Sequence, residues 1–338
     1  MNISVHMRQI SLTKSFLFLI LLPLENICLF LTRRDGMVTK QQINAVKSYL
    51  DDLSAKGNFN GSVLVGRKDK ILFAKAYGYA NFEWEVKNTI DTKFKLGSLT
   101  KPLTACLIIL LAQKGMLQFQ DKISKYIENT PKKWKDITIH HLLTHTSGIL
   151  NFQRHKDWGS KNMYNTFKPL DFLEIIFKMK QEFKPGERYS YSNSAYYLLG
   201  IIIERITISS YEEAMRKFIF KPLSMFNSGL CSELDIVPKF ADGYTLNNSK
   251  KDILEKGKYE NMSIPYSAGG LYSTVEDLFK WSQGLENRDF LSLEYYNFLI
   301  EGNKYENDPF HRIVTYGLGK NTIKVSENLT KTILHHNG

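Results

Sequence analysis

Apolar residues recur along the chain at two spacings, and each spacing predicts a different element. In residues 40–56 they stand three and four positions apart, which predicts an amphipathic helix that ends before Gly57. Residues 62–66 and 71–77 are dense in apolar and β-branched residues and are joined by a short polar connector, which predicts a β-hairpin. The folded region therefore begins with a helix and a hairpin.

The middle of the chain is predicted to be mostly helical. Apolar segments of helical length lie at 102–114, 170–180 and 196–205. Later, Ser273 and Glu276 have the spacing of a capping box, which predicts that a helix begins there. Strands, a helical block and further strands in this order predict an α/β fold in which a helical insertion interrupts a sheet and forms a cleft with it.

Residues 1–36 have the pattern of a targeting segment. Arg8 and Lys14 precede a short apolar run at 16–24, as in a secretory signal peptide. The segment is also near the minimum length of a membrane span, so membrane attachment through it is the alternative. Both interpretations predict a periplasmic or extracellular protein, whereas a translation start at Met37 would leave it cytoplasmic.

Length and composition exclude several classes of protein. The 338 residues, 43% hydrophobic and 23% charged, exclude a disordered, a collagen-like and a polytopic membrane protein. Three cysteines exclude a disulfide framework and a four-cysteine zinc site. The net charge is +11, from 45 basic and 34 acidic residues. No Lys/Arg block is interleaved with aromatic residues, so no nucleic-acid partner is predicted.

Ser98 and Lys101 are the first candidates for catalysis. Positions i and i+3 of a helix share one face, which would place the lysine amine near the serine hydroxyl. If burial lowers the pKa of this amine, it can take the hydroxyl proton, and the helix N-terminus can hold an oxyanion. The same tetrapeptide, Ser-Leu-Thr-Lys, also occurs at Ser11–Lys14, where a targeting segment offers no surrounding site.

Two further short motifs could complete such a site. Tyr191 near a lysine ammonium can act as a phenolate-type base, and the Asn193 amide can orient a substrate carbonyl. At the C-terminus, His336 follows a predicted edge strand and could face the cleft, while Gly338 would let a substrate backbone approach closely. Each motif alone is more typical of packing or of an ordinary chain end.

Together the three motifs resemble those of the serine β-lactamase and penicillin-binding protein family, in its class C, carboxypeptidase and esterase-like branch. The resemblance covers residues 40–338. Four connecting stretches also resemble the family pattern: Ile137–Gly148, Tyr196–Glu204, Phe220–Met225 and Ser267–Asp277.

The resemblance implies a role for each motif residue. Ser98 would be the acylated nucleophile, and Lys101 and Tyr191 the pair that moves protons. Asn193 would contact the substrate amide, and His336 would occupy the position of the third motif. The reaction implied is hydrolysis of an ester, a D-amino-acid peptide or a β-lactam, which makes the partner a small-molecule or peptide substrate. The oligomeric state stays open.

The resemblance also implies the architecture, an antiparallel sheet flanked by helices with a large helical insertion domain, as in β-lactamases and transpeptidases. One hydrolase domain would span residues 37–338. Residues 37–97 and 266–338 would form its sheet part, and residues 98–265 its mainly helical part.

Metal binding is a separate hypothesis. His141 and His145 stand at i and i+4, a spacing that could ligate a metal ion on one helix face. No glutamate lies between them in the zincin pattern and no third ligand is evident, so neither a metal nor an organic cofactor is predicted. The family resemblance accounts for this segment as structural.

The sequence departs from the family pattern at two points. Penicillin-recognising members commonly carry lysine where this chain has His336, whose imidazole is mostly neutral at pH 7, which favours an ester or D-amino-acid peptide as substrate. In the family a further strand and a helix follow the third motif, whereas this sequence stops at Gly338 before the expected second oxyanion donor. The alternative hypothesis is therefore a truncated, catalytically inactive member that binds a ligand or partner or has no function.

Overall fold

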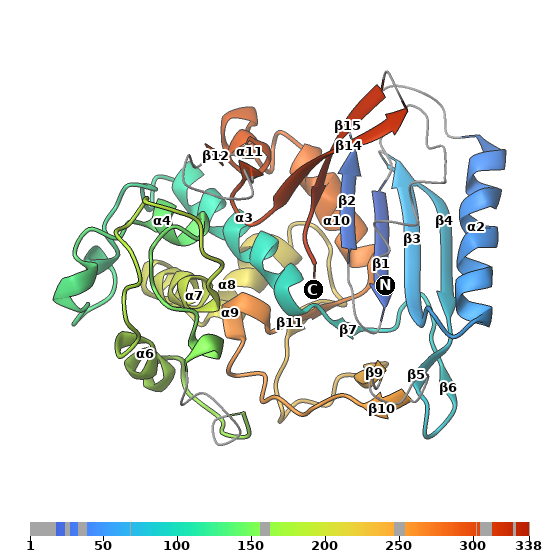
Figure 1. Ribbon diagram of the computed structural model, residues 1–338, viewed down its shortest axis with the longest axis horizontal. Helices are drawn as coiled ribbons and strands as arrows, with labels where there is room; N and C mark the ends of the chain where they lie inside the picture. The colour runs from blue at the N-terminus through green and yellow to red at the C-terminus, as the bar shows by residue number, and fades with distance from the viewer. Residues whose placement is uncertain are drawn as a thin grey trace.

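The computed structural model describes residues 18–23, 28–32, 39–67, 69–155, 163–246, 254–301, 303–304, 313–326 and 329–337. Figure 1 shows a large sheet on one side of the molecule and a block of helices on the other. Neighbouring strands of the large sheet run antiparallel, so the predicted antiparallel sheet with flanking helices is confirmed.

The helices that the structure describes bear out the helical middle of the chain. They are α2 (Lys40–Ala55), α3 (Thr100–Gln113), α4 (Ile139–Leu143), α6 (Pro169–Phe177), α7 (Asn193–Thr207), α8 (Tyr211–Met215), α9 (Tyr266–Gly269), α10 (Val275–Glu286) and α11 (Leu293–Ile300). Short 3₁₀ turns and one π turn lie between them: η2 (Gly97–Leu99), η3 (Ile123–Lys125), η4 (Lys132–Trp134), η5 (Phe152–Arg154) and η6 (Arg216–Phe220).

The described strands form one large sheet and three small ones. They are β1 (Phe18–Pro23), β2 (Cys28–Thr32), β3 (Gly61–Arg67), β4 (Lys70–Tyr77), β5 (Tyr79–Asn81), β6 (Val86–Lys87), β7 (Phe94–Lys95), β8 (Gly229–Leu230), β9 (Tyr244–Leu246), β10 (Leu254–Lys256), β11 (Leu271–Ser273), β12 (Asn303–Lys304), β13 (Ile313–Val314), β14 (Gly319–Ser326) and β15 (Leu329–His335). The order in the large sheet is β12-β13-β14-β15-β2-β1-β3-β4, and β11 lies between β7 and β8 in a small sheet beside the helical block.

Alternation along β3 explains why helices cover both faces of the sheet. Val63 and Val65 belong to a cluster with apolar residues of α2. Leu64 belongs instead to the large core, and Gly66 lies directly against the ring of Phe279 on α10. Successive side chains of a strand point to opposite faces, so a continuously buried strand needs a cover on each side. The strand β3 is therefore held between α2 and α10.

The helix α3 runs through the centre of the helical block (Figure 1). Its side chains from Thr100 to Ala112 are buried, because the sequence is apolar on every side of the helix. The helices α7, α9 and α11 pack against it. A buried helix of this kind is a rigid support for Lys101 in its first turn and for Ser98 in the 3₁₀ turn η2 just before it.

Two local predictions are wrong in detail. The cap of α10 is Thr274, whose side chain accepts from the Asp277 N–H, whereas Ser273 belongs to β11 and bonds to Ser228 at 2.7 Å. The strand before His336 is not an edge strand, because β15 pairs with β14 on one side and β2 on the other. Both errors have the same cause. The partner, Ser228 for Ser273 and β2 for β15, is distant in the sequence.

The N-terminal segment supplies two strands to the sheet. The strand β1 pairs with β3 from Phe18↔Gly66 to Pro23↔Gly61, and β2 pairs with β15. Both stretches lie within residues 1–36, for which the sequence pattern predicts a targeting segment outside the folded domain. Among the residues that the structure describes, no helix is both long and apolar enough to cross a membrane.

Candidate active site

Ser98 lies where the 3₁₀ turn η2 passes into α3, next to Gly97 in the left-handed region at φ 52°. Its Oγ is 3.0 Å from Lys101 Nζ and 2.8 Å from Tyr191 Oη. The helical spacing accounts for the first contact, and the loop before α7 supplies the second. The structure therefore brings together the serine, lysine and tyrosine that the sequence motifs singled out.

Lys101 is fully buried. Its Nζ also lies 2.7 Å from the carbonyl oxygen of Ala268 on α9, and it stands 4.7 Å from the centre of the Tyr191 ring. Burial penalises the charged form and holds the pKa of Lys101 well below its ordinary value. A neutral amine at this position has a lone pair that can accept the Ser98 proton.

Tyr191 differs from the phenolate expected from the sequence. Burial raises the pKa of its phenol, so the hydroxyl keeps its proton and donates to Ser98 Oγ. The expected phenolate relied on a lysine ammonium beside it, and burial lowers the pKa of Lys101, which disfavours that charged form. The Tyr191 hydroxyl and the Lys101 amine both donate to Ser98 Oγ in this arrangement.

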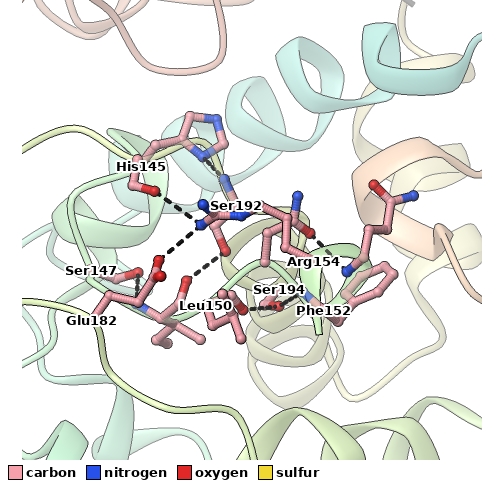
Figure 2. Close-up of polar contacts among 12 residues, drawn as sticks. His145, Ser147, Leu150, Phe152, Arg154, Glu182, Ser192 and Ser194 are labelled. Carbon is pink, nitrogen blue, oxygen red and sulfur yellow. Dashed lines mark hydrogen bonds and ion pairs between the residues drawn. The ribbon is translucent and has the colours of Figure 1, made fainter. Parts of the chain in front are cut away.

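The backbone around Tyr191 is fixed by the residues that follow it. Ser192 caps α7, and its hydroxyl bonds to the carbonyl oxygen of Ile149 at 3.0 Å. Figure 2 shows the neighbouring contacts, in which Ser194 donates to the Leu150 carbonyl at 2.8 Å and accepts from the Phe152 N–H at 2.9 Å. The loop that carries Tyr191 is thus tied to residues 149–152.

His145 was interpreted from the sequence as part of a structural segment, and the structure places it against the site. Its Nδ1 accepts from the backbone N–H of Ser192 at 3.1 Å (Figure 2). Its ring lies 4.5 Å from that of Tyr191 and 4.9 Å from that of Tyr196. Burial keeps the pKa of His145 well below its ordinary value, so the imidazole is neutral.

The two histidines that were considered as metal ligands make different hydrogen bonds. His141 Nδ1 accepts from the backbone N–H of Thr138 at the start of α4, whereas His145 Nδ1 accepts from Ser192. In the part of the chain that the structure describes, no group of three or more His, Cys, Asp and Glu could hold a metal ion.

Asn193 is the first residue of α7, and its amide contacts a residue that no sequence motif marks. Its Nδ2 donates to Gln153 Oε1 at 2.6 Å. Asn193 Oδ1 is buried without a hydrogen-bond partner among the described residues. Gln153 lies in η5, 40 residues before Asn193, so no local pattern could indicate this contact.

His336 lies beside the site at the end of β15. Its ring is 6.5 Å from that of Tyr191, and its Nδ1 is 2.6 Å from the carbonyl oxygen of Asn337. Burial holds the pKa of His336 below its ordinary value, which agrees with the neutral imidazole expected from the sequence. Gly338 and the second copy of the serine motif, Ser11–Lys14, lie outside the described residues.

The chain is similar to known proteins over most of its length. A model of the Beta-lactamase family matches residues 46–338. Penicillin-binding protein 4* of Bacillus subtilis (strain 168) is 31% identical over 263 residues, which are 73% of this chain and 56% of that protein. The teichoic acid D-alanine hydrolase of Staphylococcus aureus (strain MRSA252) is 30% identical over 254 residues, which are 75% of this chain and 61% of that protein.

Comparison with solved structures shows that the fold is similar as well as the sequence. The crystal structure of a penicillin binding protein from Bacillus halodurans aligns with a TM-score of 0.72 at 25% identity, covering 85% of this chain and 93% of that chain. This chain spans less than two thirds of the length of both curated relatives.

Proposed function

The chain belongs to the Beta-lactamase family, and we propose that it is a serine hydrolase that forms an acyl-enzyme on Ser98. One observation carries the proposal, namely that Ser98 Oγ lies within hydrogen-bond distance of both Lys101 Nζ and Tyr191 Oη. A nucleophile, a neutral amine and a phenolic donor at these distances can perform acyl transfer.

In the acylation step, Ser98 Oγ forms a bond to the carbonyl carbon of the substrate while its proton passes to the lone pair of Lys101 Nζ. The tetrahedral intermediate then collapses, and the bond from the carbonyl carbon to the leaving group breaks. The Tyr191 hydroxyl gives its proton to the leaving atom, and the Lys101 ammonium returns a proton to the tyrosine oxygen. This order follows from the neutral amine and the protonated phenol.

Water completes the reaction. Its oxygen attacks the acyl carbon while one of its protons passes to Lys101 Nζ. The bond between the acyl carbon and Ser98 Oγ breaks, the proton returns to Oγ, and the carboxylic acid product leaves. The carbonyl of Ala268 holds the amine in place through both steps, since it lies 2.7 Å from Nζ.

An ester or a D-amino-acid derivative is the substrate class that we favour. The neutral His336 supplies no positive charge for a substrate carboxylate, which weakens the case for β-lactams. A relative that is named a teichoic acid D-alanine hydrolase supports the same class. Export, with a periplasmic or extracellular site of action, completes the proposal and is supported by the charge and apolar pattern of residues 1–36. Because β1 and β2 belong to the sheet, residues 18–23 and 28–32 would stay part of the folded protein.

Labelling with an active-site-directed fluorophosphonate tests the proposal. The unaltered protein should be labelled and Ser98→Ala should not. Ser11→Ala is the matched control, because it alters the second copy of the same tetrapeptide and should be labelled like the unaltered protein. Equal labelling of Ser98→Ala would place the nucleophile elsewhere, and a folded protein that resists labelling would favour the inactive alternative.

A further inference from the structure

The helix α9 carries the carbonyl that holds Lys101, and it has only four residues, Tyr266–Gly269. A helix of one turn gains too little from its own hydrogen bonds to be stable alone, so its position depends on the elements around it. Both α3 and α7 pack against it. The position of the Ala268 carbonyl, 2.7 Å from Lys101 Nζ, is therefore set by the contacts that hold α9 against these two helices.

Thr104 makes a hydrogen bond between α3 and α9. It lies one helical turn after Lys101 on the same face of α3, and it is fully buried. Its Oγ1 is 2.7 Å from the carbonyl oxygen of Ser267, the residue before Ala268, and 3.1 Å from the carbonyl oxygen of Thr100. The shorter of these contacts joins the two helices next to the carbonyl that holds the lysine.

Tyr211 on α8 supports this contact. Its hydroxyl oxygen lies 2.7 Å from Thr104 Oγ1. A threonine hydroxyl has one proton and neither carbonyl beside it can donate, so that proton goes to a carbonyl and Tyr211 donates to Oγ1. Burial raises the pKa of Tyr211, so its hydroxyl keeps the proton that it donates. The hydrogen bonds therefore run from Tyr211 through Thr104 to the backbone of α9.

We propose that Thr104, supported by Tyr211, is a positioning residue for the catalytic base. Thr104 fixes the Ser267 carbonyl, and the next carbonyl of α9 then stays on Lys101 Nζ. A carbonyl oxygen at this distance favours the ammonium over the neutral amine, because the charged group donates the stronger hydrogen bond. The contact therefore offsets part of the burial that lowers the pKa of Lys101, which keeps the amine a stronger base. This inference rests on the proposed hydrolase function.

Removal of the Thr104 hydroxyl tests this role through the pH profile. In Thr104→Val, the midpoint of kcat/KM against pH on an ester should fall by about 0.5 to 1 pH unit and the plateau about tenfold, because a loosened Ala268 carbonyl favours the ammonium less. Thr104→Ser keeps the hydroxyl and should restore both values. Thr207→Val is the matched control, since it removes a hydroxyl that bonds to the carbonyl four residues earlier, at the far end of α7. It should lower the melting temperature and leave the midpoint unchanged.

Tyr211→Phe is the second variant, for use if Thr104→Val does not fold. It removes the donor and keeps the threonine, so the midpoint should shift in the same direction by a smaller amount. An unshifted midpoint in folded Thr104→Val, or in Tyr211→Phe where the valine variant does not fold, would overturn the positioning role. A shift that Thr104→Ser does not reverse would overturn it as well.

A measurement without substrate separates this inference from the proposed function. In protein whose lysines carry an isotope label at Cε, the resonance of Lys101 is identified by its loss in Lys101→Met. Its titration midpoint should fall in Thr104→Val and stay in place in Thr207→Val. That result in a protein that turns over no ester would overturn the hydrolase and keep the role of Thr104. Turnover by the unaltered protein, with the same Lys101 midpoint in Thr104→Val, would overturn the role of Thr104 and keep the hydrolase.

Discussion

The imidazole of His145 accepts a hydrogen bond from the backbone N–H of Ser192, with 3.1 Å between Nδ1 and the nitrogen. Ser192 lies between Tyr191 and Asn193, so this bond helps to fix the backbone from which both side chains extend. His145 itself has a positive φ of 58°, which few non-glycine residues adopt. His145 is therefore a positioning residue that acts through Tyr191.

We predict that His145→Phe lowers kcat/KM about 10- to 100-fold, the range found when a group that orients a functional residue is removed. His145→Asn should recover part of the loss, because its side-chain oxygen can accept the Ser192 N–H and asparagine tolerates a positive φ. Initial rates on an ester substrate, together with melting temperatures, provide the measurement. Equal losses for both variants at matched stability would show that the ring matters only for packing.

Much of the catalytic centre could be predicted because helical spacing is local. Ser98 and Lys101 are neighbours on one helical turn, and their contact needs no knowledge of the rest of the fold. Asn193 and Gln153 contact each other across 40 residues of chain, a separation for which the sequence has no periodicity. The pKa shifts were also beyond the sequence, since burial is the largest cause that raises the pKa of Tyr191.

The same distinction applies to the sheet. The hairpin of β3 and β4 was predicted because its two strands are adjacent in the sequence. The neighbours of β15 were not, because β2 reaches it from the other end of the chain. The composition of residues 28–32 predicts a targeting segment. Composition does not specify which strand a segment pairs with, so it could not indicate the pairing of β2 with β15.

The burial of Lys101 predicts a stability gain when the amine is removed. Lys101→Met keeps a similar length and should stabilise the fold at pH 7, because the protonated lysine of the unfolded chain must lose its proton or its hydration on burial, whereas methionine loses neither. Activity on an ester should be lost. Thermal unfolding of both proteins provides the measurement.

The stability gain of Lys101→Met should depend on pH, because burial lowers the pKa of Lys101 in the folded protein. Between the pKa of folded Lys101 and about 10.4 in the unfolded chain, the unfolded state binds one more proton. The stability of the unaltered protein therefore rises with pH across this window. The advantage of Lys101→Met should accordingly shrink from pH 7 to pH 10, and an advantage that stays constant would contradict a neutral buried amine.

The dependence of kcat/KM on pH should also reflect the titration of Lys101. Because the neutral amine is the base, kcat/KM should rise with pH and reach a plateau, with a midpoint below the ordinary value of a lysine. His336 is already neutral above its lowered pKa, so His336→Gln should leave that midpoint in place. A midpoint that disappears in His336→Gln would assign the titration to the imidazole instead of Lys101.

Tyr191→Phe tests the phenolic donor. Removing the hydroxyl takes away the hydrogen bond of 2.8 Å to Ser98 Oγ and the proton proposed for the leaving group. We expect kcat to fall about 10²- to 10⁴-fold, the usual contribution of a general acid, with KM nearly unchanged. Because the acid serves the leaving group, esters of more acidic alcohols should lose less. A uniform loss across leaving groups would indicate that the hydroxyl only holds Ser98 in place.

Gly200 lies where α7 packs on α9, and its replacement links packing to catalysis. A Cβ at this position would come within 2.2 Å of Ser267 Oγ and 2.5 Å of the Tyr266 ring. Gly200→Ala should destabilise the fold by about 1–3 kcal/mol, since overpacking outweighs the better helix propensity of alanine. It should also lower kcat/KM, because a shift of α9 moves the Ala268 carbonyl that holds Lys101. Gly243→Ala, which meets no atom within 4 Å, is the control. Equal melting temperatures for the two variants would show that the contact between α7 and α9 adjusts without cost.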